Sequence, residues 1–341
     1  MKDERAEGWS RRHFIRGLTL AGTAGLVGLR PSRADADPPP ETTKLKLLVG
    51  PATGIAPLWA AQELLVSEGF SDLQYVKIGT DTKAWAPEAF LSGEADLGLA
   101  FVPSDILHID AGAPLVILAG SHIGCVELVG SSRIRSAHDL KGKTVAVERL
   151  RSDEQTFVSL FAAHVGLDSQ KEVNWVVDPS RDHARLLTEG KIDAFITRPP
   201  WSLELRAKKI GHVLVSTTTD KPWSHYFCCL VTSTREFVRT HPVATKRAVR
   251  AIVKAADVCA VEPHRVARLI SDTGLARYDN ALQTLQEIPY GKWREHDPED
   301  AVRFFALRMR DVGMIKSSPQ KIIAEGTDWR FLNELKRELK G

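Results

Sequence analysis

Arg198 is the residue of this 341-residue chain whose type and position most directly suggest chemistry. It interrupts the end of an apolar stretch and stands immediately before Pro199 and Pro200. A guanidinium group can hold a carboxylate or a sulfonate through paired N–H donors. We therefore predict that Arg198 contributes to binding the anionic part of a small ligand.

The segment around Arg198 repeats an earlier one. GKIDAFITRPPW (190–201) aligns with GEADLGLAFVPS (93–104), and the Gly, Asp and Pro of the two segments coincide. Shared turn chemistry alone would explain the glycines, because Gly just past a helix end adopts the left-handed conformation at little cost. The matching order of predicted elements around the segments favours two similar lobes instead. Ligands of open α/β sheets bind at the carboxyl ends of strands, so we expect 101–104 and 197–201 to face one cleft.

Strand and helix signals alternate in two successive runs. The predicted strands are 45–49, 73–78, 95–100 and 115–119, then 144–147, 173–177, 192–196 and 213–216. The predicted helices between them are 57–67, 85–91, 153–164, 181–188 and 200–208. This alternation predicts parallel α/β sheets. From Arg235 onward the pattern is helical, with helices over 243–261, 263–273, 281–286, 298–312, 319–324 and 329–339 that should pack against the lobes already built.

The first 36 residues differ from the rest of the chain. Arg11-Arg12 precede a short Gly/Ala-rich run, 17–29, and the small-x-small sequence Ala34-Asp35-Ala36. This pattern is typical of a cleaved signal peptide, and the paired arginines resemble a twin-arginine (Tat) signal. The alternative is a chance Arg-Arg in a basic leader. No Cys stands at the cleavage site, so we expect no lipid anchor, a linker over 37–43 and a product free in the periplasm.

Composition excludes several function classes. The chain is 43% hydrophobic and 26% charged, without an uninterrupted apolar run of the length needed to span a membrane. Residues 1–36 carry seven Lys/Arg and four Asp/Glu, which leaves 39 basic and 39 acidic residues in the remainder. The net charge of +3 therefore belongs to the predicted signal, and the remainder lacks a basic footprint for nucleic acid.

The four cysteines, Cys125, Cys228, Cys229 and Cys259, show neither a C-x-x-C pair nor a spacing typical of zinc. Two alternatives remain for them. An oxidising compartment permits one disulfide, whereas free cysteines are among the most buried residue types.

Four motifs in order resemble the periplasmic solute-binding proteins of ABC importers. They are 54–61, 91–98, 139–147 and 190–194, and the resemblance extends over 44–325. Among these proteins, the chain resembles those with the type II fold, in the nitrate/sulfonate/taurine (NitT/TauT) branch. That branch is related to the thiamine-precursor binders. It implies two α/β lobes joined by two hinge crossover strands near 124–129 and 224–230, which close on a ligand. Lobe 1 would comprise residues 44–125, and lobe 2 would comprise residues 126–226. Residues 227–341 would return to lobe 1 and form the C-terminal helices.

The resemblance also implies where ligand contacts lie, and at each position an alternative stays open. The implied ligand-binding residues are Gly54, Ile55, Pro57, Thr80, Asp81, Phe101, Ser104, Ser121, His122, Arg149, Arg151, Ser152, Asp178, Arg198, Trp201, His225 and Tyr226. Core packing is favoured for Trp59, and a helix-dipole role for Asp153 and Glu154. For Arg149 and Arg151, the alternative to a ligand contact is a solvated side chain. Cys125 and Cys228 would lie on neighbouring hinge strands, where a disulfide is an option although facing strands often have the wrong geometry.

One departure from the family pattern bears on the ligand. The family's sulfonate binders often present a Gly/Ser-rich helix start that offers bare N–H groups to an anion. This chain has the bulky, charged 148–154 instead. Nitrate and simple sulfonates are therefore not favoured, and a larger ligand or a zwitterion suits the segment better.

The resemblance implies a solute-binding component of an ABC importer that captures a small organic solute, acidic or nitrogenous. Its partners would be a permease, an ATPase and, for the precursor, the Tat machinery; a monomer without cofactor, metal or catalytic residues is expected. An enzyme on the same fold, of the thiamine-pyrimidine or menaquinone-pathway type, is the alternative. Cys228-Cys229 resembles the start of a cysteine run, but an exported protein is poorly placed for that chemistry. A ligand sensor is a third hypothesis that the sequence does not separate from the first.

Overall fold

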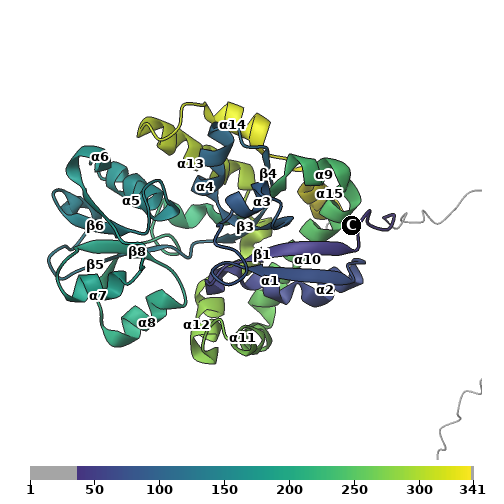
Figure 1. The fold of residues 1–341 in the computed structure, drawn as a ribbon, viewed down its shortest axis with the longest axis horizontal. Helices are drawn as coiled ribbons and strands as arrows, with labels where there is room; N and C mark the ends of the chain where they lie inside the picture. The colour runs from purple at the N-terminus through teal and green to yellow at the C-terminus, as the bar shows by residue number, and fades with distance from the viewer. Residues whose placement is uncertain (1–36, 339–341) are drawn as a thin grey trace, which may run out of the picture. The chain divides into compact units, whose positions relative to one another are not determined.

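The strands of residues 37–338 form two five-stranded sheets (Figure 1). The computed structural model describes residues 37–338, so the predicted signal peptide lies outside the described residues. The first sheet has the order β2-β1-β3-β10-β4, with β1 Lys44–Val49, β2 Asp72–Lys77, β3 Leu97–Phe101, β4 Leu115–Ile123 and β10 Phe227–Thr234. The second has the order β7-β6-β8-β5-β9, with β5 Glu127–Gly130, β6 Thr144–Val147, β7 Asn174–Val177, β8 Ala194–Thr197 and β9 His212–Ser216.

Both sheets are mixed: the strands of the predicted alternation share one direction in each sheet, and the strand at each predicted crossover is antiparallel to them. In the first sheet β1 runs parallel to β2 and β3, whereas β10 is antiparallel to β3 and β4. In the second, β6 runs parallel to β7 and β8, whereas β5 is antiparallel to β8 and β9. β5 and β10 are the strands that the chain enters directly after passing from one sheet to the other. Local periodicity carries no information about the direction in which such a strand enters. The α/β class and the two-lobed fold are confirmed.

The chain passes between the sheets twice. The first passage is the short segment 124–126 between β4 and β5, and the second is 217–226 between β9 and β10. The second passage contains the 3₁₀ turn Trp223–His225, and the Trp223 ring is buried edge-on against Phe161 and Phe304, with centroids 4.8 and 5.6 Å away. Aromatic packing of this kind fixes the passage against helices of both lobes.

Short helices follow the strands of the first sheet. They are α1 Ala56–Ala60, α2 Gln62–Ser67, α3 Glu88–Leu91 and α4 Val102–Asp110. Pro57 lies in the first turn of α1, where its missing N–H has no cost. The predicted helix over 85–91 is wrong at its start. Pro87 disfavours helical backbone at the preceding residue, so Trp85 remains in the loop before α3. Trp59 is buried and stacks on Tyr75 at 4.8 Å between centroids, as the core-packing alternative requires.

The second sheet is covered by α5 Asp153–His164, α6 Ser169–Glu172, α7 His183–Thr188 and α8 Trp201–Lys208. α5 begins where the sequence predicts. The Ser152 hydroxyl caps it by accepting the Gln155 N–H at 3.3 Å, and Asp153 and Glu154 occupy its first turn.

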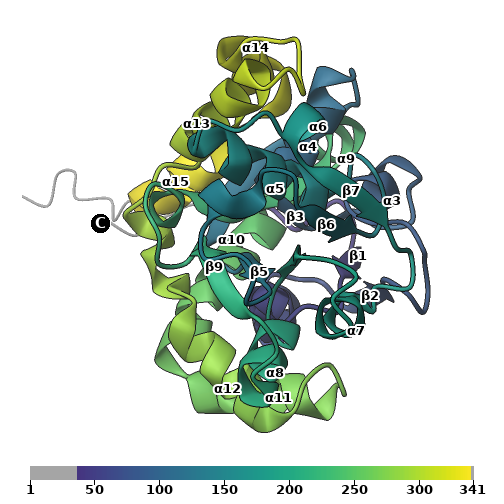
Figure 2. The same cartoon turned by 90° about the vertical axis from the view of Figure 1, so that its left-hand side faces the viewer.

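The last third of the described chain, after β10, is helical. Its helices are α9 Arg235–Thr240, α10 Pro242–Val261, α11 Pro263–Asp272, α12 Tyr278–Glu287, α13 Pro298–Asp311, α14 Pro319–Gly326 and α15 Arg330–Glu338. As predicted, they pack against elements of the first sheet: α10 lies on α1 and β4, and α13 and α14 lie on α4. In Figure 2, α11 and α12 lie together at the bottom of the view, and α14 lies at the top. Among residues 37–338, no helix combines the length and apolarity needed to cross a bilayer.

Candidate functional site

The ends of strands from the two sheets lie against each other. The Thr53 N–H, in the loop after β1, donates to the carbonyl of Pro199, in the loop after β8, at 3.0 Å. The Phe101 ring at the end of β3 meets Phe157 of α5 edge-on at 5.8 Å. These contacts bring the two repeated segments to one boundary, which is the cleft position expected for ligands of this type of fold.

Arg198 lies at this boundary and is half-buried. Its guanidinium carbon is 5.3 Å from the centre of the Phe101 ring and 5.7 Å from that of Trp85. Within 37–338, no hydrogen bond or ion pair involves this guanidinium group. Aromatic faces attract a cation but accept few hydrogen bonds, so the five N–H donors of Arg198 are available to an anion.

Trp85 is a part of the site that sequence reasoning missed. Besides Arg198 it contacts Arg181, whose guanidinium carbon lies 4.3 Å from the Trp85 ring centre. Arg181 in turn forms an ion pair with Glu148. A Trp from lobe 1 therefore lies against two arginines of lobe 2. The residue before Pro87 is predisposed to a loop, and that local signal could have removed Trp85 from the predicted helix.

Two neighbouring cavities share Arg198 and Glu154. The larger has a volume of about 240 Å³ and lies in the second lobe; its lining comprises Glu154, Arg181, His183, Ala184, Phe195, Ile196, Thr197, Arg198, Trp201, Glu204, Leu205, Lys208 and Ile210. The smaller, of about 20 Å³, is lined by Trp85, Glu148, Arg149, Ser152, Asp153, Glu154 and Arg198. The larger volume is below the range of about 300–1,000 Å³ usual for drug-sized ligands, which matches a small solute.

Asp153 brings an acidic group beside Arg198. Burial raises the pKa of Asp153 to about 6, although Arg198 and Arg149 favour the ionised form. Its Oδ1 is buried and has no hydrogen-bond partner within 37–338. Asp153 is thus a first-turn residue, as predicted, and also a lining residue of the cleft. A guanidinium and a carboxyl group side by side can bind the two ends of a zwitterion.

Further carboxyl groups lie behind this pair. Asp105 in α4 is fully buried, accepts the Thr232 hydroxyl at 2.6 Å and has a pKa raised by burial to about 7. Glu88 at the start of α3 lies 3.6 Å from His108 and 3.3 Å from Arg149 of the other lobe. Arg149 is therefore ion-paired across the boundary rather than only solvated.

The structure brings some of the predicted ligand-binding residues to the boundary. Phe101, Arg149, Ser152 and Arg198 contact or line it, and Trp201 lines the larger cavity with 39% of its surface exposed. Ser104 is buried in the first turn of α4, and Gly54, Ile55 and Pro57 are buried where β1 ends. These positions agree with the expectation that contacts cluster at strand ends, and their ligand role stays a prediction.

Other predicted residues lie elsewhere. Thr80 and Asp81 are exposed in a turn, where the Asp81 carboxylate accepts the Lys77 N–H at 2.9 Å. The Asp178 Oδ1 accepts the Ser180 hydroxyl at 2.7 Å, whereas its Oδ2 is buried without a hydrogen-bond partner within 37–338 and lies 3.9 Å from His183 Nε2. Arg151 is exposed, His225 is exposed, and the Tyr226 ring stacks on Phe304 at 3.8 Å. Ser121 and His122 precede the first passage between the sheets, as predicted, but they belong to β4 and are 1% exposed. Strand-end counting placed them in the cleft because β4 was predicted four residues too short.

A comparison with family models matches the NMT1-like family over residues 38–271, more than half of the chain. The chain belongs to the NMT1-like family. No curated protein matches it significantly. The match agrees with the relationship that the sequence motifs predicted.

Solved structures with the same fold include binding proteins and an enzyme. The periplasmic nitrate-binding protein NrtA from Synechocystis PCC 6803 has a TM-score of 0.75 at 16% identity, over 89% of this chain and 90% of that chain. The alkanesulfonate-binding protein SsuA from Xanthomonas axonopodis pv. citri, bound to MOPS, has a TM-score of 0.67 at 16% identity, over 85% and 99%. The desulfurization enzyme DSZB has a TM-score of 0.62 at 17% identity, over 87% and 99%. At these identities the likeness concerns the fold.

Proposed function

We propose that this protein is the periplasmic solute-binding component of an ABC importer and holds a small organic anion or zwitterion between its lobes. The observation that carries the proposal is Arg198, a guanidinium group that forms no hydrogen bond or ion pair with any residue of 37–338. It lies between the Trp85 and Phe101 rings where the strand ends of the two sheets meet. The fold shared with nitrate- and alkanesulfonate-binding proteins supports this reading.

The ligand class follows from the pair of charges in the cleft. Arg198 would bind a carboxylate or sulfonate through paired N–H donors. The buried, unpartnered Oδ1 of Asp153 would accept a hydrogen bond from an amine or another donor at the opposite end of the ligand. The aromatic rings provide an apolar wall for the part between. A zwitterion or an anion with a donor group satisfies all three, whereas nitrate would leave Asp153 unpaired.

The remaining parts of the proposal concern export, location, oligomeric state and partner proteins. Export by the Tat route, release into the periplasm, a monomeric state and delivery of solute to a permease and an ATPase are consistent with the leader sequence and the family. A receptor that signals instead of delivering solute would use the same site. We assign lobe 1 to 44–125 with the return 227–341, and lobe 2 to 126–226. We propose no catalytic role, and the shared fold of DSZB makes an assay for turnover of any bound ligand worthwhile.

A thermal-shift screen tests the proposal. The purified protein is tested against sulfonates, carboxylates, amino-acid-like zwitterions, pyrimidines and amines. A ligand at about 100 times its Kd stabilises the folded protein by about 2.7 kcal/mol, which gives a clear shift in Tm. We expect the largest shift with one anionic or zwitterionic class.

Two variants localise the effect. Arg198→Ala should remove the shift, whereas Arg151→Ala is a matched control because Arg151 is exposed and lines neither cavity of the boundary. An unchanged shift in Arg198→Ala would remove Arg198 from the site. A response only to amines would contradict the proposed anionic ligand.

A further inference from the structure

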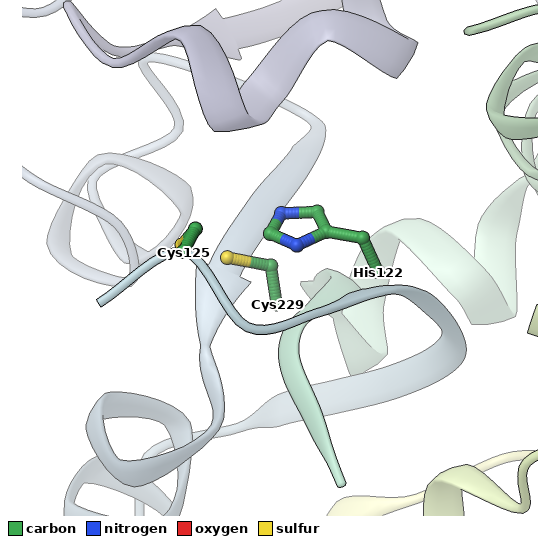
Figure 3. Close-up of side chains that lie close together, drawn as sticks. All are labelled: His122, Cys125 and Cys229. Carbon is green, nitrogen blue, oxygen red and sulfur yellow. The ribbon is translucent and has the colours of Figure 1, made fainter. Parts of the chain in front are cut away.

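A cluster of metal-binding side chains lies where the chain first passes between the lobes. His122 at the end of β4, Cys125 in the passage and Cys229 in β10 direct their side chains toward one another (Figure 3). One ligand atom from each of them lies within 4.8 Å of the other two. Their exposures are 1%, 4% and 5%, so the cluster is closed to bulk water. None of these residues lines the cavities beside Arg198.

The position of the cluster follows from the pairing of distant strands. Cys229 is the partner of His122 on one side of β10 and of Phe101 on the other. The ladder between β10 and β4 is irregular next to Cys229, and such irregularities re-aim side chains. The strand order, not sequence spacing, therefore assembles the three ligands.

His122 gives an independent indication of a missing partner. Both ring nitrogens are buried, and neither has a hydrogen-bond partner within 37–338. A neutral imidazole carries one donor and one acceptor, and leaving both unpaired in a dry interior is costly. Its contact with the Tyr290 ring, at 5.3 Å, is edge-on and does not satisfy them. A metal ion bound to one ring nitrogen would give this buried imidazole the partner that it lacks.

Cys125 is held in an unusual backbone conformation that aims its thiol at the cluster. Its φ is +101°, in the region that residues other than Gly seldom adopt. Its N–H donates to the Thr218 hydroxyl at 3.1 Å, which fixes the turn. Unfavourable backbone conformations persist at functional sites when the surroundings impose them.

We propose that His122, Cys125 and Cys229 bind one thiophilic metal ion, Cu⁺ or Zn²⁺, at the passage between the lobes. Two thiolates and an imidazole are soft or borderline ligands, which select these ions over Mg²⁺ or Ca²⁺. Three ligands complete a trigonal site for Cu⁺. Zn²⁺ takes four, and Cys228, whose sulfur lies 3.6 Å from that of Cys125, could supply the fourth. Binding replaces the proton of each thiol that becomes a ligand and changes no oxidation state.

The test uses the reduced protein without oxygen. Co²⁺ replaces Zn²⁺ as an absorbing probe, Zn²⁺ is titrated against a chromophoric chelator, and Cu⁺ is titrated against bicinchoninate. We expect one ion per chain and thiolate-to-Co²⁺ charge-transfer absorption. The ion with the higher affinity distinguishes the trigonal site from the four-ligand one.

Cys229→Ser should weaken binding by about 100-fold or more, because even partners outside the ligand set change metal affinity by roughly 10- to 100-fold. Cys259→Ser is the matched control, since Cys259 is also fully buried but lies in α10 and is not one of the three clustered ligands. Equal affinity in the two variants would place the ion on surface groups and overturn the proposal. Absence of both thiolate-to-Co²⁺ absorption and Cu⁺ binding in competition with bicinchoninate, in the reduced wild-type protein, would overturn it as well, whether or not the variants fold.

Discussion

The two repeated segments, 93–104 and 190–201, share the residues that anchor a strand and differ in the residues that we propose for the site. In each, a Gly with a φ near +70° follows a helix: +72° at Gly93 and +71° at Gly190. The Asp96 carboxylate accepts the Lys46 N–H at 2.7 Å, and the Asp193 carboxylate accepts the Thr144 N–H at 2.9 Å. The Gly and the Asp that the two segments share therefore have the same structural role in both sheets.

The two segments diverge after the strand. β3 ends at Phe101 and α4 begins at the next residue, whereas β8 ends at Thr197 and α8 begins only at Trp201. Arg198 consequently stays outside a helix and projects among the aromatic rings of the boundary. The repeat therefore specifies a common strand anchor, and the proposed ligand contact, Arg198, is one of the few residues that differ after it.

The largest effect should come from breaking the shared anchor. Asp96→Ala and Asp193→Ala each leave a backbone N–H of the neighbouring strand without its acceptor. Each should lower the free energy of unfolding by about 1–3 kcal/mol, measured by urea denaturation. Ligand affinity of the folded fraction should be retained in both. If only one of the two variants is destabilised, the two anchors are not equivalent.

The second-largest effect is expected from removing the Trp85 ring, which forms part of the aromatic wall beside Arg198. Trp85→Ala removes the ring that lies against both Arg181 and Arg198. Contacts of this kind are worth about 0.5–2 kcal/mol, so the affinity for the ligand found by screening should fall roughly tenfold in calorimetric titration. Unchanged affinity, with the free energy of unfolding also unchanged, would exclude Trp85 from the site.

A smaller effect is expected from pH. The raised pKa of Asp153, about 6, means that this carboxyl group is mostly ionised at pH 8 and mostly neutral at pH 5. The charged groups that act on it are Arg198, Arg149 and Glu154. For a purely anionic ligand, affinity should rise about fivefold from pH 8 to pH 5, because two unit charges about 4 Å apart repel by about 1 kcal/mol even in water.

Asp153→Asn should abolish this pH dependence, and calorimetry at several pH values measures it. A zwitterion whose amine contacts Asp153 should show the opposite trend and lose affinity as the pH falls. A wild-type profile that is flat, or one that persists in Asp153→Asn, would contradict the placement of Asp153 in the site.

The smallest effect should come from the ion pair across the boundary. Arg149 and Glu88 have 47% and 39% of their side chains exposed, and exposed pairs contribute about 0–1 kcal/mol. Arg149→Ala should therefore lower the free energy of unfolding by less than about 1 kcal/mol and weaken ligand binding only slightly. A loss as large as that of Arg198→Ala would make Arg149 a principal ligand contact.

Local patterns predicted most of the fold and only part of the site. Alternating strands and helices are encoded in hydrophobic periodicity, and the proline at the start of α1 and the acidic first turn of α5 lie where expected. The direction of β5 and β10 depends on where the chain crosses between sheets, which periodicity does not encode.

Arg198 is recognisable because it interrupts a strand end. Asp153 was interpreted only through the helix dipole, and Trp85 was hidden in a predicted helix. The proximity of His122 to Cys229 arises from strand order alone.

The central claim is that Arg198 supplies the anion contact of an interlobe site. Isothermal titration with the best anionic ligand and with its uncharged amide or sulfonamide analogue tests it most directly, in the wild type, Arg198→Ala and Arg151→Ala. Hydrogen bonds to charged groups are worth about 1.5–3 kcal/mol, so Arg198→Ala should weaken the anion about 10- to 100-fold and abolish its preference over the neutral analogue, with Arg151→Ala unchanged. Equal losses in the two arginine variants, or a preference for the anion retained in Arg198→Ala, would contradict the account.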